Sequence, residues 1–125
     1  MQFNNDKSIF LQIADSITDK VLSGVYPTGE KIPSVRELAA EMGVNPNTVM
    51  RTYNELQSMN IIDNKRGIGY FVNPEAPKII RKQRREIFFQ KVLPEFTRQA
   101  ALLGITFSEL KSQLQHLDNH NSHEN

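Results

Sequence analysis

Two helix starts eleven residues apart, with a glycine between them, constrain this chain more than any other feature. Ser34 is a preferred N-cap residue, and Glu37, three residues later, completes a capping box. Gly43 supplies the positive φ with which many helices end. Asn45 then caps a second helix, whose first turn accepts Pro46 because an N–H there has no helical partner. Helix, tight turn and second helix together predict a helix-turn-helix unit.

Each of these two helices is expected to bury one face. The apolar residues of the first recur at helical spacing, and the inward stripe of the second consists of Val49, Tyr53 and Leu56. The remaining positions of the second helix therefore face outward, and they carry mostly polar side chains: Asn47, Thr48, Met50, Arg51 and Asn54. A helix with a polar, outward first turn is typical of a recognition helix.

The residues that follow predict a β-hairpin, or wing. Ile61–Asp63 and Tyr70–Val72 are short strand-like runs, and the segment between them contains two glycines. Lys65 and Arg66 fall near its tip, where cations suit contact with phosphate or with the minor groove. We expect the short extended piece Lys31–Pro33 to pair with this hairpin. The chain is thus predicted to be mainly α with a small β-wing.

On these motifs, the segment from Ile9 to Val72 resembles the winged helix-turn-helix domain of the GntR superfamily of bacterial transcription regulators. The resemblance covers about half of the chain, and the run Asn45–Val49 with a short helical tail is similar to the YtrA-type branch. The residues that carry it are Ile13-Ala14, Leu22–Gly24, Pro27, Gly29–Ser34, Arg36–Ala39, Gly43–Asn45, Asn47–Val49, Arg66-Gly67, Gly69 and Phe71-Val72.

The resemblance implies a DNA-binding surface. It places Arg36 against phosphate or a base edge, and the alternative is a surface ion pair with Glu37, Glu41 or another acid. Asn47 and Thr48 are the best candidates to read bases, because an amide can pair with adenine and a threonine methyl can meet that of thymine. The complete expected set is Ser34, Arg36, Asn45, Pro46, Asn47, Thr48, Met50, Arg51, Lys65, Arg66 and Gly67.

For some members of this set, helix capping is a second explanation of the residue type. Others differ from the residue that is common in the family. Capping alone accounts for Ser34, and capping and DNA contact can coexist at Asn45. The first turn of the recognition helix is expected to offer free N–H groups to phosphate. Pro46 and Met50 stand where much of the family has basic residues, so guanine-reading side chains are missing there. Arg51 either compensates for that loss or contacts phosphate.

The C-terminal part has a different composition. Two prolines make residues 74–77 a linker between the DNA-binding domain, residues 1–73, and a helical module at 78–117. Pro94 is expected to kink the long helix of this module without ending it. Gly104 closes that helix, and Thr106 with Glu109 caps a last helix whose inward side ends at Leu117. Residues 118–125 are predicted to be a disordered tail.

Two amphipathic helices cannot bury their apolar stripes alone, so we expect this module to form a homodimer. The predicted contact residues are Ile80, Ile87, Phe88, Val92, Phe96, Leu103, Phe107, Leu110 and Leu114. About fifty residues leave little room for a ligand pocket, which makes direct sensing of a small effector doubtful. The basic run Arg81–Arg85 is either a solvated helix face or a second nucleic-acid patch, and the solvated face is favoured.

Composition excludes several functions. The sequence has no cysteine, and its three histidines all lie in the last ten residues, at positions 116, 120 and 123. No paired-carboxylate, phosphate-loop or cofactor motif appears, so we expect neither an enzyme nor a cofactor. His116, His120 and His123 with Asp118 are read as a polar tail more readily than as a metal site. No apolar run approaches a membrane span and no signal peptide is recognised, which favours the cytoplasm.

The distribution of charge gives weaker evidence for DNA binding than the motifs do. Residues 1–75 carry seven Lys and Arg against nine Asp and Glu, so the presumed DNA-binding half is not basic overall. Four of these cations nevertheless fall on the presumed DNA side: Arg36, Arg51, Lys65 and Arg66. We therefore expect a homodimeric regulator, more readily a repressor, that binds an inverted-repeat operator in double-stranded DNA. The resemblance implies control of a neighbouring transporter operon, often of the ABC type. The competing function is a winged helix that binds protein or RNA.

Overall fold

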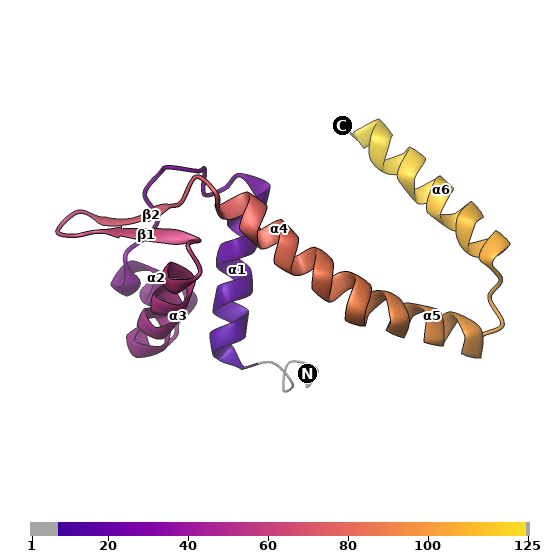
Figure 1. Cartoon of the computed structure of the whole chain (residues 1–125), viewed down its shortest axis with the longest axis horizontal. Coiled ribbons are helices and arrows are strands. Elements are labelled where there is room, and N and C mark those ends of the chain that lie inside the picture. Colours follow the sequence, from indigo (N-terminus) through magenta and orange to yellow (C-terminus); the bar gives the residue numbers. More distant parts are fainter. Residues whose placement is uncertain (1–7, 125) are drawn as a thin grey trace. The chain divides into compact units, whose positions relative to one another are not determined.

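The structure is a computed structural model that describes residues 8–124, with side chains described for residues 8–121. It divides into two compact units, Met1–Arg84 and Arg85–Asn125, which are considered separately. The elements of the first are α1 (Ile9–Ser23), α2 (Val35–Met42), α3 (Pro46–Ser58), β1 (Ile62–Lys65), β2 (Gly69–Val72) and most of α4 (Ala76–Ile87) (Figure 1). This is the expected winged helix-turn-helix.

The helix boundaries follow the predicted caps. Ser34 accepts the N–H of Glu37, and the Glu37 carboxylate accepts the N–H of Ser34 at 2.8 Å, which completes the capping box. Gly43 ends α2 in the left-handed region, with φ 67°. Asn45 caps α3, and Pro46 occupies its first turn. The turn between the two helices is therefore specified by local chemistry.

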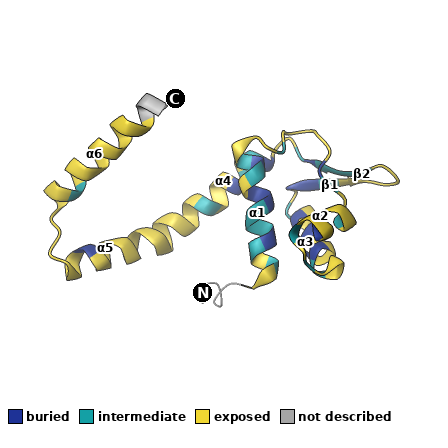
Figure 2. Cartoon of the chain, turned by 180° about the vertical axis from the view of Figure 1, so that it is seen from behind, coloured by how far each residue is buried: buried dark blue, intermediate teal, exposed yellow. Residues whose placement is uncertain are grey.

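One apolar core holds the first unit together. The buried faces of α1, α2 and α3 meet there, and the predicted stripe of Val49, Tyr53 and Leu56 is almost completely buried. The β-hairpin closes the core through Ile62, which pairs with Val72. Figure 2 shows this burial in dark blue along the inner sides of the helices and at the hairpin base. The core thus fixes α2 and α3 against the hairpin.

The hairpin is paired as expected. Its antiparallel register runs from Ile62 opposite Val72 to Lys65 opposite Gly69. Lys31 forms a single bridge with Phe71, which confirms that the extended piece before α2 joins the wing. The wing is therefore tied to the segment that leads into α2.

The predicted linker is wrong in its secondary structure. α4 begins at Ala76, and Pro77 is its second residue, where a proline costs no helical hydrogen bond. Ala76 and Ile80 are buried in the core of the first unit. Ile80 is therefore a core residue here and is removed from the expected dimer contacts, because its side chain is only 1% exposed.

The second unit contains the end of α4, the π-helical segment η2 (Phe88–Val92), α5 (Leu93–Leu102) and α6 (Phe107–Glu124). The helix continues past Pro94, as predicted. The π-helical turn lies just before this proline, whose ring and missing N–H disturb the regular hydrogen bonding of the preceding turn. Gly104 has a φ of 68°, and Thr106 and Glu109 form the expected cap.

The predicted disordered tail is also wrong for the residues that the structure describes. α6 runs to Glu124, past the last predicted helical residue, Leu117. The polar residues after Asp118 extend a helix that is already formed, and propagation of a helix costs less than nucleation. Asn125 lies outside the described residues.

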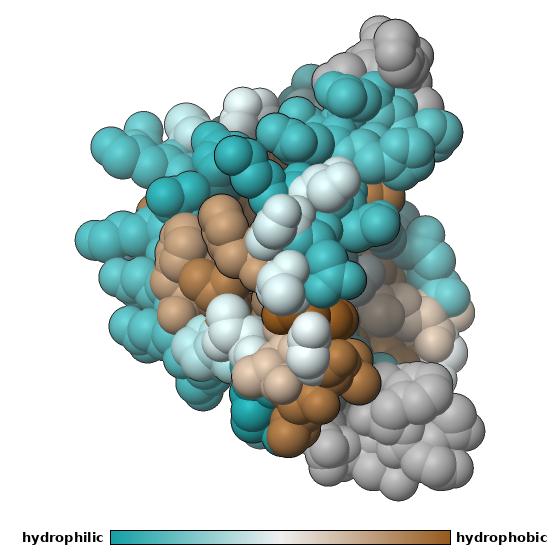
Figure 3. Space-filling view, turned by 90° about the vertical axis from the view of Figure 1, so that its right-hand side faces the viewer, coloured by the Kyte–Doolittle hydropathy of each residue, from teal (hydrophilic) through white to brown (hydrophobic). Residues whose placement is uncertain are grey.

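Apolar side chains remain exposed over the second unit. They include Phe88, Val92, Phe96, Leu103, Phe107 and Leu114, with exposed fractions from 45% to 79%. Figure 3, viewed from the side of α5 and α6, shows hydrophobic groups in brown gathered on this face. None of the described helices combines the length and apolar character that crossing a membrane requires.

Candidate nucleic-acid interface

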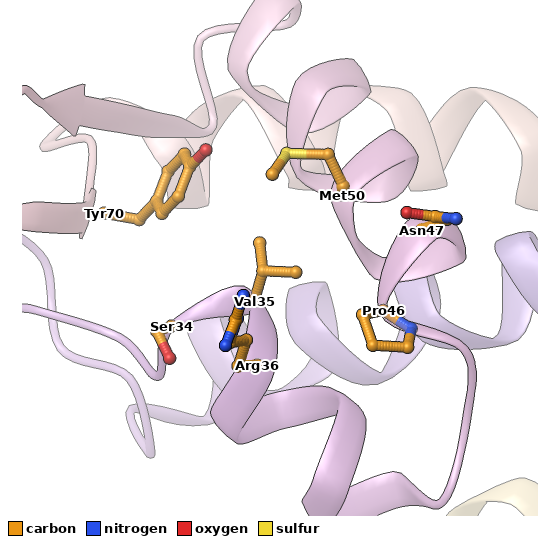
Figure 4. Close-up of a pocket in the computed structure, with 7 residues that line it drawn as sticks. All are labelled: Ser34, Val35, Arg36, Pro46, Asn47, Met50 and Tyr70. Atoms are coloured by element: carbon orange, nitrogen blue, oxygen red, sulfur yellow. The ribbon is translucent and has the colours of Figure 1, made fainter.

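A hollow of about 420 Å³ lies between the start of α2, the start of α3 and the hairpin (Figure 4). Five of its lining residues belong to the predicted DNA-binding set, and two, Val35 and Tyr70, do not. The complete lining is Ser34, Val35, Arg36, Pro46, Asn47, Met50 and Tyr70. The fold thus brings together three elements on which the predicted interface residues lie.

Arg36 carries a free charge at this hollow. Within residues 8–121, the ion pairs join Arg84 to Asp19 and Arg98 to Glu95, so the guanidinium of Arg36 belongs to neither. The Glu37 carboxylate is instead directed to the backbone of Ser34, and these hydrogen bonds lower the pKa of Glu37. The predicted alternative, an ion pair for Arg36, is absent from the described part of the chain.

The first turn of α3 differs from the expectation. Asn45 accepts the N–H of Asn47 through its side chain at 2.8 Å, and its carbonyl accepts those of Thr48 and Val49 at 3.0 and 3.3 Å. Pro46 has no N–H to offer. The predicted free N–H groups at the start of the recognition helix are therefore already used, and its outward side chains are what remains for a partner.

The start of α2 has the free N–H groups instead. The capping box uses the N–H groups of Ser34 and Glu37, and Leu38 donates to the carbonyl of Ser34. Val35 and Arg36 have no backbone acceptor within the described part of the chain. These two N–H groups lie at the positive end of an eight-residue helix, on residues that line the hollow.

Two tyrosines, one behind the other, stiffen the hairpin side of the hollow. Tyr53 is fully buried and donates its hydroxyl hydrogen to the carbonyl of Pro33 at 2.7 Å, and burial raises its pKa. The ring of Tyr70 meets the ring of Tyr53 edge to face, with centroids 4.8 Å apart. Tyr70 is therefore held in place by an anchored neighbour. From the sequence, Tyr70 was predicted only to lie in a strand.

The remaining predicted residues lie outside the hollow. The ammonium group of Lys65 lies 4.2 Å from the ring centroid of Phe71, and the turn beyond it contains Arg66 and Gly67, with a φ of 78° at the glycine. Arg51 lies over the ring of Phe10 on α1 at 5.7 Å. The wing cations are exposed at the hairpin tip, whereas Arg51 points toward α1.

Among the described residues, no three His, Asp or Glu side chains lie close enough together to hold a metal ion. His123, one member of the candidate cluster, has its side chain outside the described residues.

Comparison with known proteins identifies this arrangement. Residues 10–72 match the model for "Bacterial regulatory proteins, gntR family", which is half of the chain. The chain belongs to the GntR family. It is 38% identical to the uncharacterized HTH-type transcriptional regulator YhcF of Bacillus subtilis over 87% of this chain and 88% of that protein.

Two further comparisons agree. The HTH-type transcriptional repressor YtrA of Bacillus subtilis is 32% identical over 82% of this chain and 78% of its own length. A crystal structure of a GntR-family regulator from Bacteroides thetaiotaomicron superposes with a TM-score of 0.74 and 43% identity, over 91% of this chain and 99% of that one. The chain is thus a DNA-binding transcription regulator of the GntR family and not an enzyme.

Proposed function

We propose that this GntR-family protein is a homodimeric repressor that binds an inverted-repeat operator. The exposed hydrophobic side chains of the second unit support the homodimer, because few monomeric proteins leave so large an apolar face to water. Two linked recognition helices enter successive major grooves, so the half-sites lie about one helical turn apart. The sign of regulation rests on the similarity to YtrA, a repressor by name.

The observation that supports the DNA site is the meeting of α2, α3 and the hairpin around a hollow. Its arginine, Arg36, has no ion pair within residues 8–121. The DNA-contacting residues are the eleven predicted ones. Asn47 and Met50 face the hollow from α3, and the wing cations lie beyond it. The resemblance to the YtrA-type branch further favours a neighbouring ABC-transporter operon as the regulated target.

The experiment is a binding titration on the duplex upstream of the protein's own coding sequence and on a scrambled duplex of equal length. A specific regulator prefers the native duplex by about a thousandfold or more, and its affinity falls as salt rises. A footprint then shows two protected half-sites about one turn apart. Equal affinity for both duplexes would contradict an operator at that place.

A further inference from the structure

The Tyr70 hydroxyl is a polar group that the predicted interface does not use. It has no hydrogen-bond partner within the described part of the chain, whereas the hydroxyl of Tyr53 behind it is bonded to Pro33. Figure 4 shows the Tyr70 side chain projecting from β2 toward Met50 of α3, with Val35 of α2 below them. A hydroxyl on a half-buried ring thus faces a hollow that is open to solvent.

Apart from the side-chain amide of Asn47 on α3, the donors around this hollow come from two elements, α2 and β2. The N–H groups of Val35 and Arg36 lie at the start of α2, together with the Arg36 guanidinium, and none of them has an acceptor in the described part of the chain. Ser34 accepts from Glu37 through its hydroxyl oxygen, so its own hydrogen remains available. Across the hollow stands the hydroxyl of Tyr70.

Apart from the amide of Asn47, the rest of the lining is apolar. Val35, Pro46 and Met50 present hydrocarbon and thioether surface between the donors. A DNA strand offers the matching chemistry, because a deoxyribose is largely apolar and the adjoining phosphate is a charged acceptor. The edges of adenine and cytosine fit less well, since each exposes an amino donor in the major groove.

We propose that this hollow receives one sugar-phosphate of the DNA backbone and that the Tyr70 hydroxyl donates a hydrogen bond to that phosphate. Tyr70 thereby takes over the anchoring that the first turn of α3 cannot provide, since its N–H groups are bonded within the chain. The contact fixes the depth and orientation of the recognition helix without reading sequence. This inference needs only the DNA binding of the family, and neither dimerisation nor repression.

The test compares Tyr70→Phe with Tyr26→Phe as a matched control. Tyr26 is also half-buried, but it lies outside the hollow, where Lys20 stacks on its ring at 5.4 Å. Both variants keep their rings, so thermal unfolding should match that of the wild type. Affinity is measured at several salt concentrations on the upstream duplex and on the scrambled duplex.

For Tyr70→Phe we expect about a tenfold loss of affinity on both duplexes, because a hydrogen bond to a charged group is lost. The salt dependence should stay unchanged, since the hydroxyl is neutral. Arg36→Ala should instead reduce the salt slope by about one. Wild-type affinity of Tyr70→Phe would overturn the proposal, and so would a loss confined to the upstream duplex, which would mean contact with a base.

If the proposed operator is not in the upstream duplex, the titrations give a different result. In that case the wild-type protein binds the two duplexes equally, yet Tyr70→Phe still lowers its affinity for the scrambled duplex. The two proposals are therefore separable in one set of titrations.

Discussion

At the residue scale, Asn45 is the N-cap of α3 and one of the proposed DNA contacts. Its side chain and carbonyl together satisfy three N–H groups at the start of α3. Replacing it with alanine should lower the free energy of unfolding by about 1 kcal/mol, the usual cost of losing a cap. Urea unfolding followed by circular dichroism measures this change.

Asn45→Asp is the matched variant at the same position. Aspartate caps as well as asparagine, so stability should stay within about 0.5 kcal/mol of the wild type. The new negative charge next to DNA phosphates should nevertheless weaken binding severalfold at low salt, and less at high salt. Equal loss of stability in both variants would show that the cap is not the role of this side chain.

At the scale of the element, Arg84 attaches α4 to α1. Its guanidinium donates to the carboxylate of Asp19 at 2.6 Å, to the carbonyl of Asp15 at 3.3 Å and to the hydroxyl of Thr18. The ion pair is partly exposed, with 38% of the arginine and 64% of the aspartate side chain open to water, so water screens it. Arg84→Ala should therefore cost about 1 kcal/mol of unfolding free energy.

Arg81→Ala is the control, because Arg81 is exposed on the same helix and has no hydrogen bond or ion pair in the described part of the chain. Amide hydrogen exchange across Ala76–Ile87 should quicken in Arg84→Ala and stay as in the wild type in Arg81→Ala. Similar exchange in both variants would mean that buried Ala76 and Ile80 alone hold α4 to the first unit.

At the scale of the whole molecule, we expect the exposed apolar side chains of the second unit to govern the proposed dimerisation. Leu114 is 58% exposed, so a charge there disturbs little within a single chain. Leu114→Glu should weaken the proposed homodimer by at least about tenfold, because it places two carboxylates in an apolar contact. Analytical ultracentrifugation over a concentration series measures the dissociation constant.

Gln113→Glu adds the same carboxylate one residue away and should leave the dimer unchanged, because Gln113 lies on a different side of α6. The monomeric Leu114→Glu variant should also lose operator affinity by tenfold or more, since its two recognition helices no longer bind as a linked pair. An intact dimer in Leu114→Glu would move the interface away from α6.

The sequence alone determined the features that depend on neighbouring residues. The capping box at Ser34, the positive φ at Gly43 and the cap at Asn45 arise within three or four residues, so their chemistry is readable from the chain. The outward positions of α3 followed from helical period, and they include Asn47 and Met50 of the hollow's lining. Arg36 was expected from the resemblance to the family.

Only the tertiary structure decided which of those groups remain available. Ile80 lies on an apolar stripe like its neighbours, but contact with the core buries it. Proline at 77 reads as a helix breaker until the helix start is seen to lie at Ala76. The unbonded hydroxyl of Tyr70 depends on the packing of Tyr53 behind it and on α2 and α3 meeting β2 in space. Whether a side chain remains exposed or unbonded depends on residues distant in the chain, so it cannot be predicted from the neighbouring sequence.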